Sequence, residues 1–138
     1  MTFLVDTTIL ILRERHDQVL TWFSAQLAAD NLAVCDVVVL EYLMGARSGA
    51  HYDELDGALG GMHRIEIEPV DWQRARVVHR DLAHQTGGGQ RAVKIPDLII
   101  AAAAERAEVP IAHYDEDYDR IAAVTGQASV WVAPRGSL

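Results

Sequence analysis

The segment His113 to Ile121, HYDEDYDRI, carries four carboxylates in five residues, and it follows a short apolar run, VPIA. Carboxylates at this spacing repel one another, so a fold that keeps them together needs a compensating ligand or solvent. Three kinds of structure would account for such a cluster: a calcium-binding loop, a metal site for phosphate chemistry, or a solvated acidic turn.

Three further acids stand at positions that can carry chemistry. Asp6 follows the β-rich run TFLV, and Asp97 stands at the start of the apolar helical segment PDLIIAAAAERAE. Both would also serve as ordinary N-terminal helix residues, where a negative charge interacts favourably with the helix dipole. Glu41 shares a helical stripe with three apolar residues: Val37, Leu40 and Met44. A buried carboxylate in this stripe would be costly unless it were neutralised or coordinated.

The elements that must position these acids alternate between strand and helix. Strands are expected at five places, in chain order: 2–5, 31–36, 63–70, 109–115 and 130–133. The intervening segments have helical spacing or capping residues, with Pro69 opening a helix that runs to Thr86. GGGQRAVK, residues 87–94, is expected to be a flexible connector. This alternation predicts one α/β domain over residues 1–138, with a mainly parallel sheet of four to five strands flanked by helices.

Sites in parallel α/β folds lie beyond the carboxyl ends of the strands. Asp6 and Asp115 each come after a predicted strand, while Glu41 and Asp97 lie on helices that follow or precede strands. The positions of these acids favour one convergent site. Hard oxygen ligands without a set of histidines or cysteines indicate Mg²⁺, with Mn²⁺ as the alternative. Repulsion between the acids is expected to raise their pKa values without metal.

The overall composition is that of a globular protein. The single cysteine, Cys35, cannot form an internal disulfide, which suits a reducing cytoplasm. The first residues lack the basic region of a signal peptide, and no apolar run is long enough for a membrane span, so a soluble cytoplasmic protein is expected. The net charge of −8 argues against a nucleic-acid partner only if the acids are spread out, because clustered acids can bind metal.

The chain resembles the PIN-domain family, and more narrowly the VapC-type toxins of bacterial toxin–antitoxin pairs. The resemblance rests on the order Asp6, Glu41, Asp97, Asp115 within VDTTIL, VVVLEYLMGA, KIPDLIIAAAAE and PIAHYDEDYDRIA, and it covers nearly the whole chain. It implies a doubly wound parallel sheet and a metal-dependent endoribonuclease that hydrolyses RNA phosphodiester bonds and inhibits translation or growth. It also implies a homodimer and a small VapB-type antitoxin that covers the active site.

The resemblance assigns roles to individual residues. Four acids match the family's metal-binding and catalytic positions: Asp6, Glu41, Asp97 and Asp115. Asp117 matches an accessory acid of the family. Bound Mg²⁺ would activate water and stabilise charge on phosphate oxygens. We expect the three aspartates among the four to bind metal, and Glu41 to bind metal or to orient the attacking water. Whether one ion or two is used stays open.

Several other residues near the acids are candidates for substrate binding. Thr8 matches a small hydroxyl residue of the family, whereas His113 replaces the Thr or Ser of many members. Arg91 and Lys94 precede Asp97 and could contact phosphate, as an alternative to serving only solubility. Arg47 follows the helix of Glu41, and Arg13 and Arg15 follow the first helix.

Other chemistries fit the sequence less well. The calcium loop fails because Arg120 stands where glycine is required and Gly126 replaces the final glutamate. A receiver domain would need paired acids after the first strand, and GGGQRAVK is not a phosphate-binding P-loop. His79 and His84 do not share a helix face, and Cys35 lacks an evident base partner. A PIN-like module that binds RNA or protein without turnover remains; the loss of an acid would favour it, and none is missing.

Overall fold

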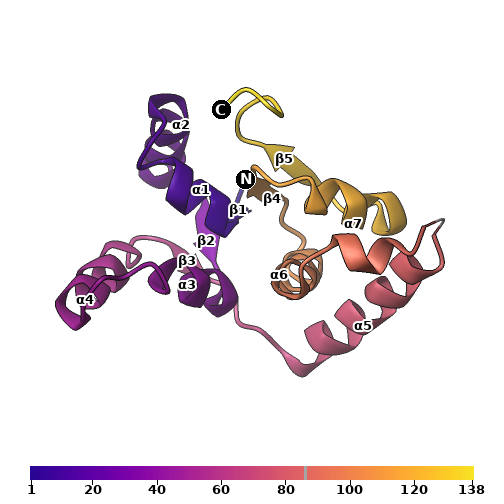
Figure 1. The fold of residues 1–138 in the computed structure, drawn as a ribbon. Helices are drawn as coiled ribbons and strands as arrows, with labels where there is room; N and C mark the ends of the chain where they lie inside the picture. The colour runs from indigo at the N-terminus through magenta and orange to yellow at the C-terminus, as the bar shows by residue number, and fades with distance from the viewer. Residues whose placement is uncertain (86) are drawn as a thin grey trace.

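The computed structural model describes residues 1–85 and 87–138 and contains a five-stranded parallel sheet in the order β3–β2–β1–β4–β5 (Figure 1). The strands are short: β1 (Phe3–Val5), β2 (Leu32–Val34), β3 (His63–Arg64), β4 (Ile111–His113) and β5 (Ser129–Trp131). The chain starts at the central strand, winds outward through β2 and β3, then returns to the other side of β1 for β4 and β5. The predicted doubly wound α/β fold is therefore confirmed.

Helices fill every connection between strands. The first two connections hold α1 (Thr7–Leu12), α2 (Asp17–Ala28), α3 (Asp36–Leu43) and α4 (Gly49–Ala58). The crossover from β3 to β4 holds α5 (Pro69–Ala83), the short 3₁₀-helix η1 (Gly89–Ala92) and α6 (Ile95–Arg106), and α7 (Asp117–Thr125) precedes β5. In Figure 1, α4 and α5 lie at opposite ends of the molecule. No helix in the described part of the chain has the length and apolar character that crossing a membrane requires.

The core forms around α6 and the inner strands. Every residue from Leu98 to Ala104 is buried, as expected for a helix that is apolar nearly all round. All three residues of β2 and of β4 are also buried, which is typical of parallel strands covered on both faces. Contacts with α3, α5 and α7 hold this buried helix in place, and this positions Asp97 in its first turn.

Three local predictions were wrong or incomplete. The third strand, expected over 63–70, is paired only at His63–Arg64, since it lies at the sheet edge with one neighbour and Pro69 begins α5. The expected flexible connector contains η1, which folds back onto α5. The helix expected to end at Thr86 ends at Ala83, and Thr86 itself lies outside the described residues.

The orientation expected for α3 was also wrong. The stripe assigned to the core includes Leu40 and Met44, which are 60% and 84% exposed. The core is instead contacted by the opposite side of the helix: Val38, Val39, Tyr42 and Leu43. Because α3 is apolar on nearly every side, hydrophobic periodicity could not indicate which side packs inward. Glu41 is half-buried at the boundary between the two sides.

Candidate metal centre

The ends of two neighbouring strands bring the first pair of acids together. Val5 of β1 pairs with Ala112 of β4, and Asp6 follows directly, its backbone N–H donating to Ala112 O at 2.9 Å. Asp115 lies just beyond the end of β4. The direction of winding changes between β1 and β4, and in doubly wound sheets this is where a crevice opens beyond the strand ends.

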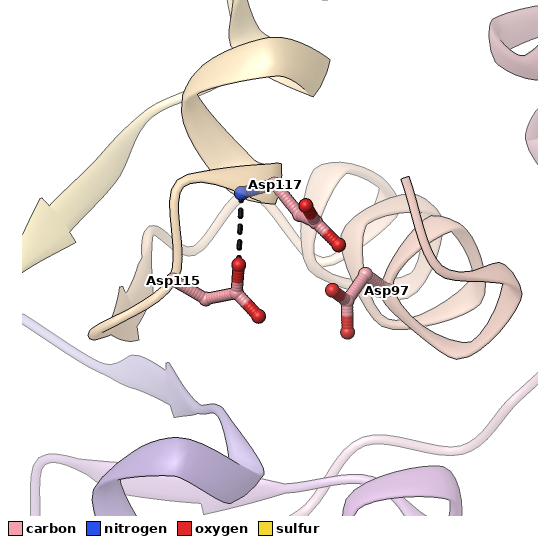
Figure 2. Close-up of side chains that lie close together, drawn as sticks. All are labelled: Asp97, Asp115 and Asp117. Carbon is pink, nitrogen blue, oxygen red and sulfur yellow. Dashed lines mark hydrogen bonds between the residues drawn. The ribbon is translucent and has the colours of Figure 1, made fainter. Parts of the chain in front are cut away.

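Two helix N-termini add carboxylates to this crevice. Asp97 lies in the first turn of α6 and Asp117 opens α7, and both side chains are buried. Oxygens of Asp97, Asp115 and Asp117 all lie within 4.8 Å of one another. Figure 2 shows the three carboxylates directed toward a common space, with the Asp117 N–H donating to Asp115 Oδ1 at 2.9 Å.

Asp6 is held from both sides. Its Oδ2 accepts from the N–H and hydroxyl of Thr8 at 3.1 and 2.6 Å, which caps α1. Its Oδ1 accepts from the Tyr118 hydroxyl at 2.6 Å, and the same hydroxyl lies 3.3 Å from Asp97 Oδ1. Asp6 is thus a helix cap and a member of the acidic cluster at once. Tyr118 is buried beneath the cluster and links Asp6 to Asp97.

Glu41 reaches the same crevice from α3. Its Oε1 accepts from the Thr7 hydroxyl at 2.9 Å. Burial raises the pKa of Glu41, and the nearby Asp6 and Asp115 raise it further. A pocket of about 180 Å³ is lined by all four predicted catalytic acids together with four neighbours: Asp6, Glu41, Asp97, Asp115, Thr7, Thr8, Ile11 and Lys94.

The pKa values of Asp97 and Asp117 are shifted in opposite directions. Burial is the main cause that raises the pKa of Asp97 to about 8, and the adjacent carboxyls of Asp117 and Asp6 add to it. Repulsion thus contributes as expected, but burial contributes more. The pKa of Asp117 is lowered, because hydrogen bonds from Lys94 outweigh the effect of burial.

The donor set fits a divalent cation. Every candidate ligand is a carboxylate oxygen, the donor type that Mg²⁺ prefers. Asp97 Oδ2 is buried and accepts no hydrogen bond among the described residues, although the Lys94 ammonium lies 3.3 Å away. A buried oxygen held only by such a long contact is costly unless a ligand satisfies it. Asp97 belongs to the group of three aspartates that could hold a metal ion, so a metal bound there would offer this carboxylate a ligand.

Comparison with known proteins agrees with this geometry. Residues 3–124 match the PIN domain. The chain is 46% identical over 138 residues to Ribonuclease VapC18 of Mycobacterium tuberculosis, covering 100% of both chains. The chain belongs to the PIN-domain family. A second relative, Ribonuclease VapC51 of the same species, is 36% identical over 138 residues and covers 100% of this chain and 98% of that protein.

Solved structures show the same PIN fold. A toxin–antitoxin complex from Klebsiella pneumoniae matches with a TM-score of 0.73 at 20% identity, covering 96% of this chain and 98% of that one. A DNA-bound VapBC structure from Salmonella typhimurium gives a TM-score of 0.74 at 13% identity, covering 96% and 99%. At such low identity the agreement concerns the path of the backbone.

His113, named above as a departure from the family pattern, is buried and acts as a hydrogen-bond acceptor. Its Nδ1 accepts from the Asp115 N–H at 3.1 Å, which fixes the turn that carries Asp115. The buried ring lies 4.9 Å from the ring of Tyr118 and 5.0 Å from that of Trp131. Burial lowers the pKa of His113 despite the nearby carboxylates, so the imidazole is neutral.

The candidate substrate-binding residues fall into different surroundings. The Thr8 hydroxyl donates to Asp6 and accepts from the Tyr114 N–H, so it is engaged within the protein although it lines the pocket. Arg91 is exposed on η1, and in the described part of the chain no hydrogen bond or ion pair joins its side chain to the acids. Lys94, in contrast, reaches into the acidic cluster itself.

Two supporting residues were missed by sequence reasoning. Thr7 holds Glu41, and Arg120 donates to Asp117 Oδ1 at 2.9 Å. The doubled threonine in VDTT and the three-residue spacing from Asp117 to Arg120 on a helix are the signals that could have indicated them. Cys35 is buried, as expected, and burial raises its pKa to about 11. Of the two histidines expected at the surface, His84 is exposed at the C-cap of α5, whereas His79 is half-buried on the helix.

Proposed function

We propose that the protein is a Mg²⁺-dependent endoribonuclease that acts as the toxin of a VapBC-type toxin–antitoxin module. The observation that carries the proposal is the convergence of Asp6, Glu41, Asp97 and Asp115, from four separate elements, on one pocket. Relatives that match the chain over its full length are named ribonucleases. The fold is also that of solved toxin–antitoxin complexes.

The residues of the cluster have complementary roles in phosphodiester hydrolysis. Asp97, Asp115 and Asp117 would hold the divalent ion, with Asp6 beside them, and Mn²⁺ suits the same donors. The bound ion would lower the pKa of a water molecule and offset charge on the phosphate oxygens. Glu41, held by Thr7 and with a raised pKa, is placed to orient the attacking water and to accept its proton.

A second pocket offers a path for the RNA backbone. It has a volume of about 340 Å³, shares Ile11 and Glu41 with the acidic pocket, and is also lined by Arg15 and Arg47. We assign these two arginines to phosphate contacts on one side of the cleavage site, because guanidinium groups match phosphate oxygens in a bidentate manner. Arg91, which precedes Lys94 in the sequence and is exposed, is a further candidate for contact with RNA phosphate.

The partners follow from the same assignment. We propose a VapB-type antitoxin and a homodimer, in keeping with the toxin–antitoxin complexes among the solved structures. Exposed apolar side chains on α2 and α3 provide surface for such contacts: Leu20, Leu27, Leu40 and Met44. A ribonuclease toxin meets its RNA in the cytoplasm, where we place the protein.

Cleavage of a mixed cellular RNA pool tests the proposal. Purified protein is incubated with Mg²⁺, with chelator, and as the Asp97→Asn variant. We expect discrete fragments only with Mg²⁺ and wild-type protein, and a loss of at least roughly two orders of magnitude in rate for the variant, since metal-ion catalysis supplies several kcal/mol.

The matched control is Asp53→Asn, which removes an exposed carboxylate of α4 and should cleave like wild type. Fragments that persist with chelator and with Asp97→Asn would contradict the proposal. Folded protein, free of antitoxin, that binds RNA without cleaving it would favour the binding module instead.

A further inference from the structure

Lys94 occupies the position between the three clustered aspartates. Its Nζ lies 2.8 Å from Asp115 Oδ2, 2.8 Å from Asp117 Oδ2 and 3.3 Å from Asp97 Oδ2. These three side chains are also the ones whose oxygens could hold a metal ion. The ammonium group therefore uses oxygens that a cation in this site would need.

Lys94 is the only lysine in the chain, where every other basic side chain apart from histidine is an arginine. The ammonium is a compact point charge on a flexible stem, whereas a guanidinium is a larger planar fork. Of the two, the ammonium is closer in shape to a metal ion and fits among three converging carboxylates. The choice of lysine at this one position is thus consistent with a substitute cation.

The side chain can leave the cluster without disturbing the backbone. The Lys94 backbone N–H donates to Asp117 Oδ2 at 3.1 Å and the residue caps α6, so the main chain is fixed. The side chain is nevertheless 57% exposed, although Lys94 lines the acidic pocket and its ammonium contacts the acids. Rotation about its side-chain bonds would carry the ammonium into solvent at the pocket mouth.

We propose that Lys94 is a built-in counter-ion, which holds the three aspartates together when no metal is bound and is displaced when a divalent cation enters. The displaced ammonium then lies at the mouth of the pocket, where an RNA phosphate would approach. Lys94 is a positioning residue in the metal-free protein and a phosphate contact in the loaded one. This inference rests on the metal site of the proposed function.

Displacement can be observed directly, because the only lysine gives one set of side-chain signals. Wild-type protein labelled with ¹³C at lysine Cε is titrated with Mg²⁺, and the Cε signal is followed by NMR. We expect the signal to shift and to sharpen as the side chain becomes mobile, with a midpoint equal to the Kd from calorimetry. A signal that stays in place at saturating Mg²⁺ would overturn the inference, and no substitution is involved.

Calorimetric Mg²⁺ binding provides the second readout. Removing the competing ammonium with Lys94→Gln should tighten binding about tenfold, which corresponds to about 1.4 kcal/mol. The matched control is Arg91→Gln, which removes one positive charge three residues away and should change the Kd by less than about twofold, as expected for a screened, exposed charge. Equal effects of the two substitutions would mean a general charge effect and would overturn the inference.

The same titration separates this inference from the proposed function. If neither wild type nor Lys94→Gln binds Mg²⁺, the metal site itself is refuted, and both proposals fall. If both proteins bind Mg²⁺ with the same Kd, only the counter-ion role is refuted. If Asp97→Asn abolishes binding while Lys94→Gln strengthens it, both proposals are supported.

Discussion

Asp71 and Asp97 occupy nearly the same local position but have opposite surroundings. Each lies in the first turn of a helix with proline at its start, and their exposed fractions are 1% and 2%. Asp71 closes a capping box with Glu68 and accepts from Arg106 Nε and Nη2 at 3.0 and 3.1 Å. Asp97 shares one long hydrogen bond with Tyr118, and its Oδ2 has no hydrogen-bond partner among the described residues.

The difference separates a carboxylate used for stability from one kept for a ligand. The protein satisfies Asp71 completely, so this group joins α5 to the end of α6. At Asp97 the nearby cation is the Lys94 ammonium, 3.3 Å away on a largely exposed side chain, and the other neighbours are acids. Burial is the main cause that raises the pKa of Asp97 to about 8, and the neighbouring acids add to it. A buried carboxyl group without fixed partners lowers stability and persists where function needs it.

The largest effect on stability is expected at the structural pair. Arg106→Met leaves buried Asp71 without its partner and should lower the free energy of unfolding by about 3 kcal/mol, measured by urea denaturation. Arg76→Met, at an exposed arginine of α5, is the control and should change stability by less than about 0.5 kcal/mol. Similar values for both variants would mean that the Asp71–Arg106 pair is not a structural anchor.

The stabilisation of the protein by bound metal should depend on Asp97 and not on the Asp71–Arg106 pair. Mg²⁺ at a hundred times its Kd should stabilise the wild-type protein by about 2.7 kcal/mol, since it binds only the folded chain. Asp97→Asn should lose most of this gain, whereas Arg106→Met, although less stable, should keep it in full. Thermal unfolding with Mg²⁺ and with chelator measures the gain in stability of each protein. A wild-type unfolding midpoint that is the same with Mg²⁺ and with chelator would contradict the assignment of the site.

A smaller effect is expected from pH in the absence of metal. The unfolded chain loses the Asp97 proton near its ordinary pKa of 3.8, whereas the folded protein keeps it up to a pKa of about 8. Folding is therefore penalised increasingly as pH rises through this window. The lowered pKa of Asp117 changes stability only at pH values near and below the ordinary pKa of an aspartate, which lie outside the window in which Asp97 acts.

Asp97→Asn removes this penalty. Relative to wild type, the variant should gain on the order of 1 kcal/mol of stability between about pH 6 and about pH 7, measured in chelator by urea denaturation. Asp53→Asn, at an exposed acid, should show no such trend. The difference in the free energy of unfolding between wild type and Asp97→Asn should therefore change with pH. If this difference is constant across the range, Asp97 is already ionised in the metal-free protein.

The acids at strand ends and at helix N-termini were the parts of the site that the sequence could predict. Asp6 and Asp115 follow β1 and β4, and neighbouring parallel strands end at the same edge, so their proximity follows from the topology. The burial of Asp97 follows from the apolar character of α6. For Glu41 the argument from the helical stripe was wrong, because α3 packs through its other side. The resemblance named Glu41 independently, and a hydrogen bond from Thr7 holds its side chain at the pocket.

The position of the Lys94 ammonium could not be predicted from the sequence. Its partners Asp115 and Asp117 are more than twenty residues away along the chain, and the contact depends on the rotamers of a long side chain. Sequence reasoning assigned Lys94 to phosphate because charge alone does not show whether a lysine points toward its own acids or toward solvent. The same limit applies to His113, whose acceptor role depends on the turn after β4.

The pairing of β1 with β4 joins Leu4 to Ile111, near opposite ends of the chain. Contacts between such distant residues form late, because a long loop must close before they contribute. During synthesis more than a hundred residues after Asp6 must therefore leave the ribosome before Asp6 can meet Asp115. For the ribonuclease proposed above, a nascent chain that has not yet exposed β4 lacks the assembled acids, so it cannot cleave the messenger from which it is being made.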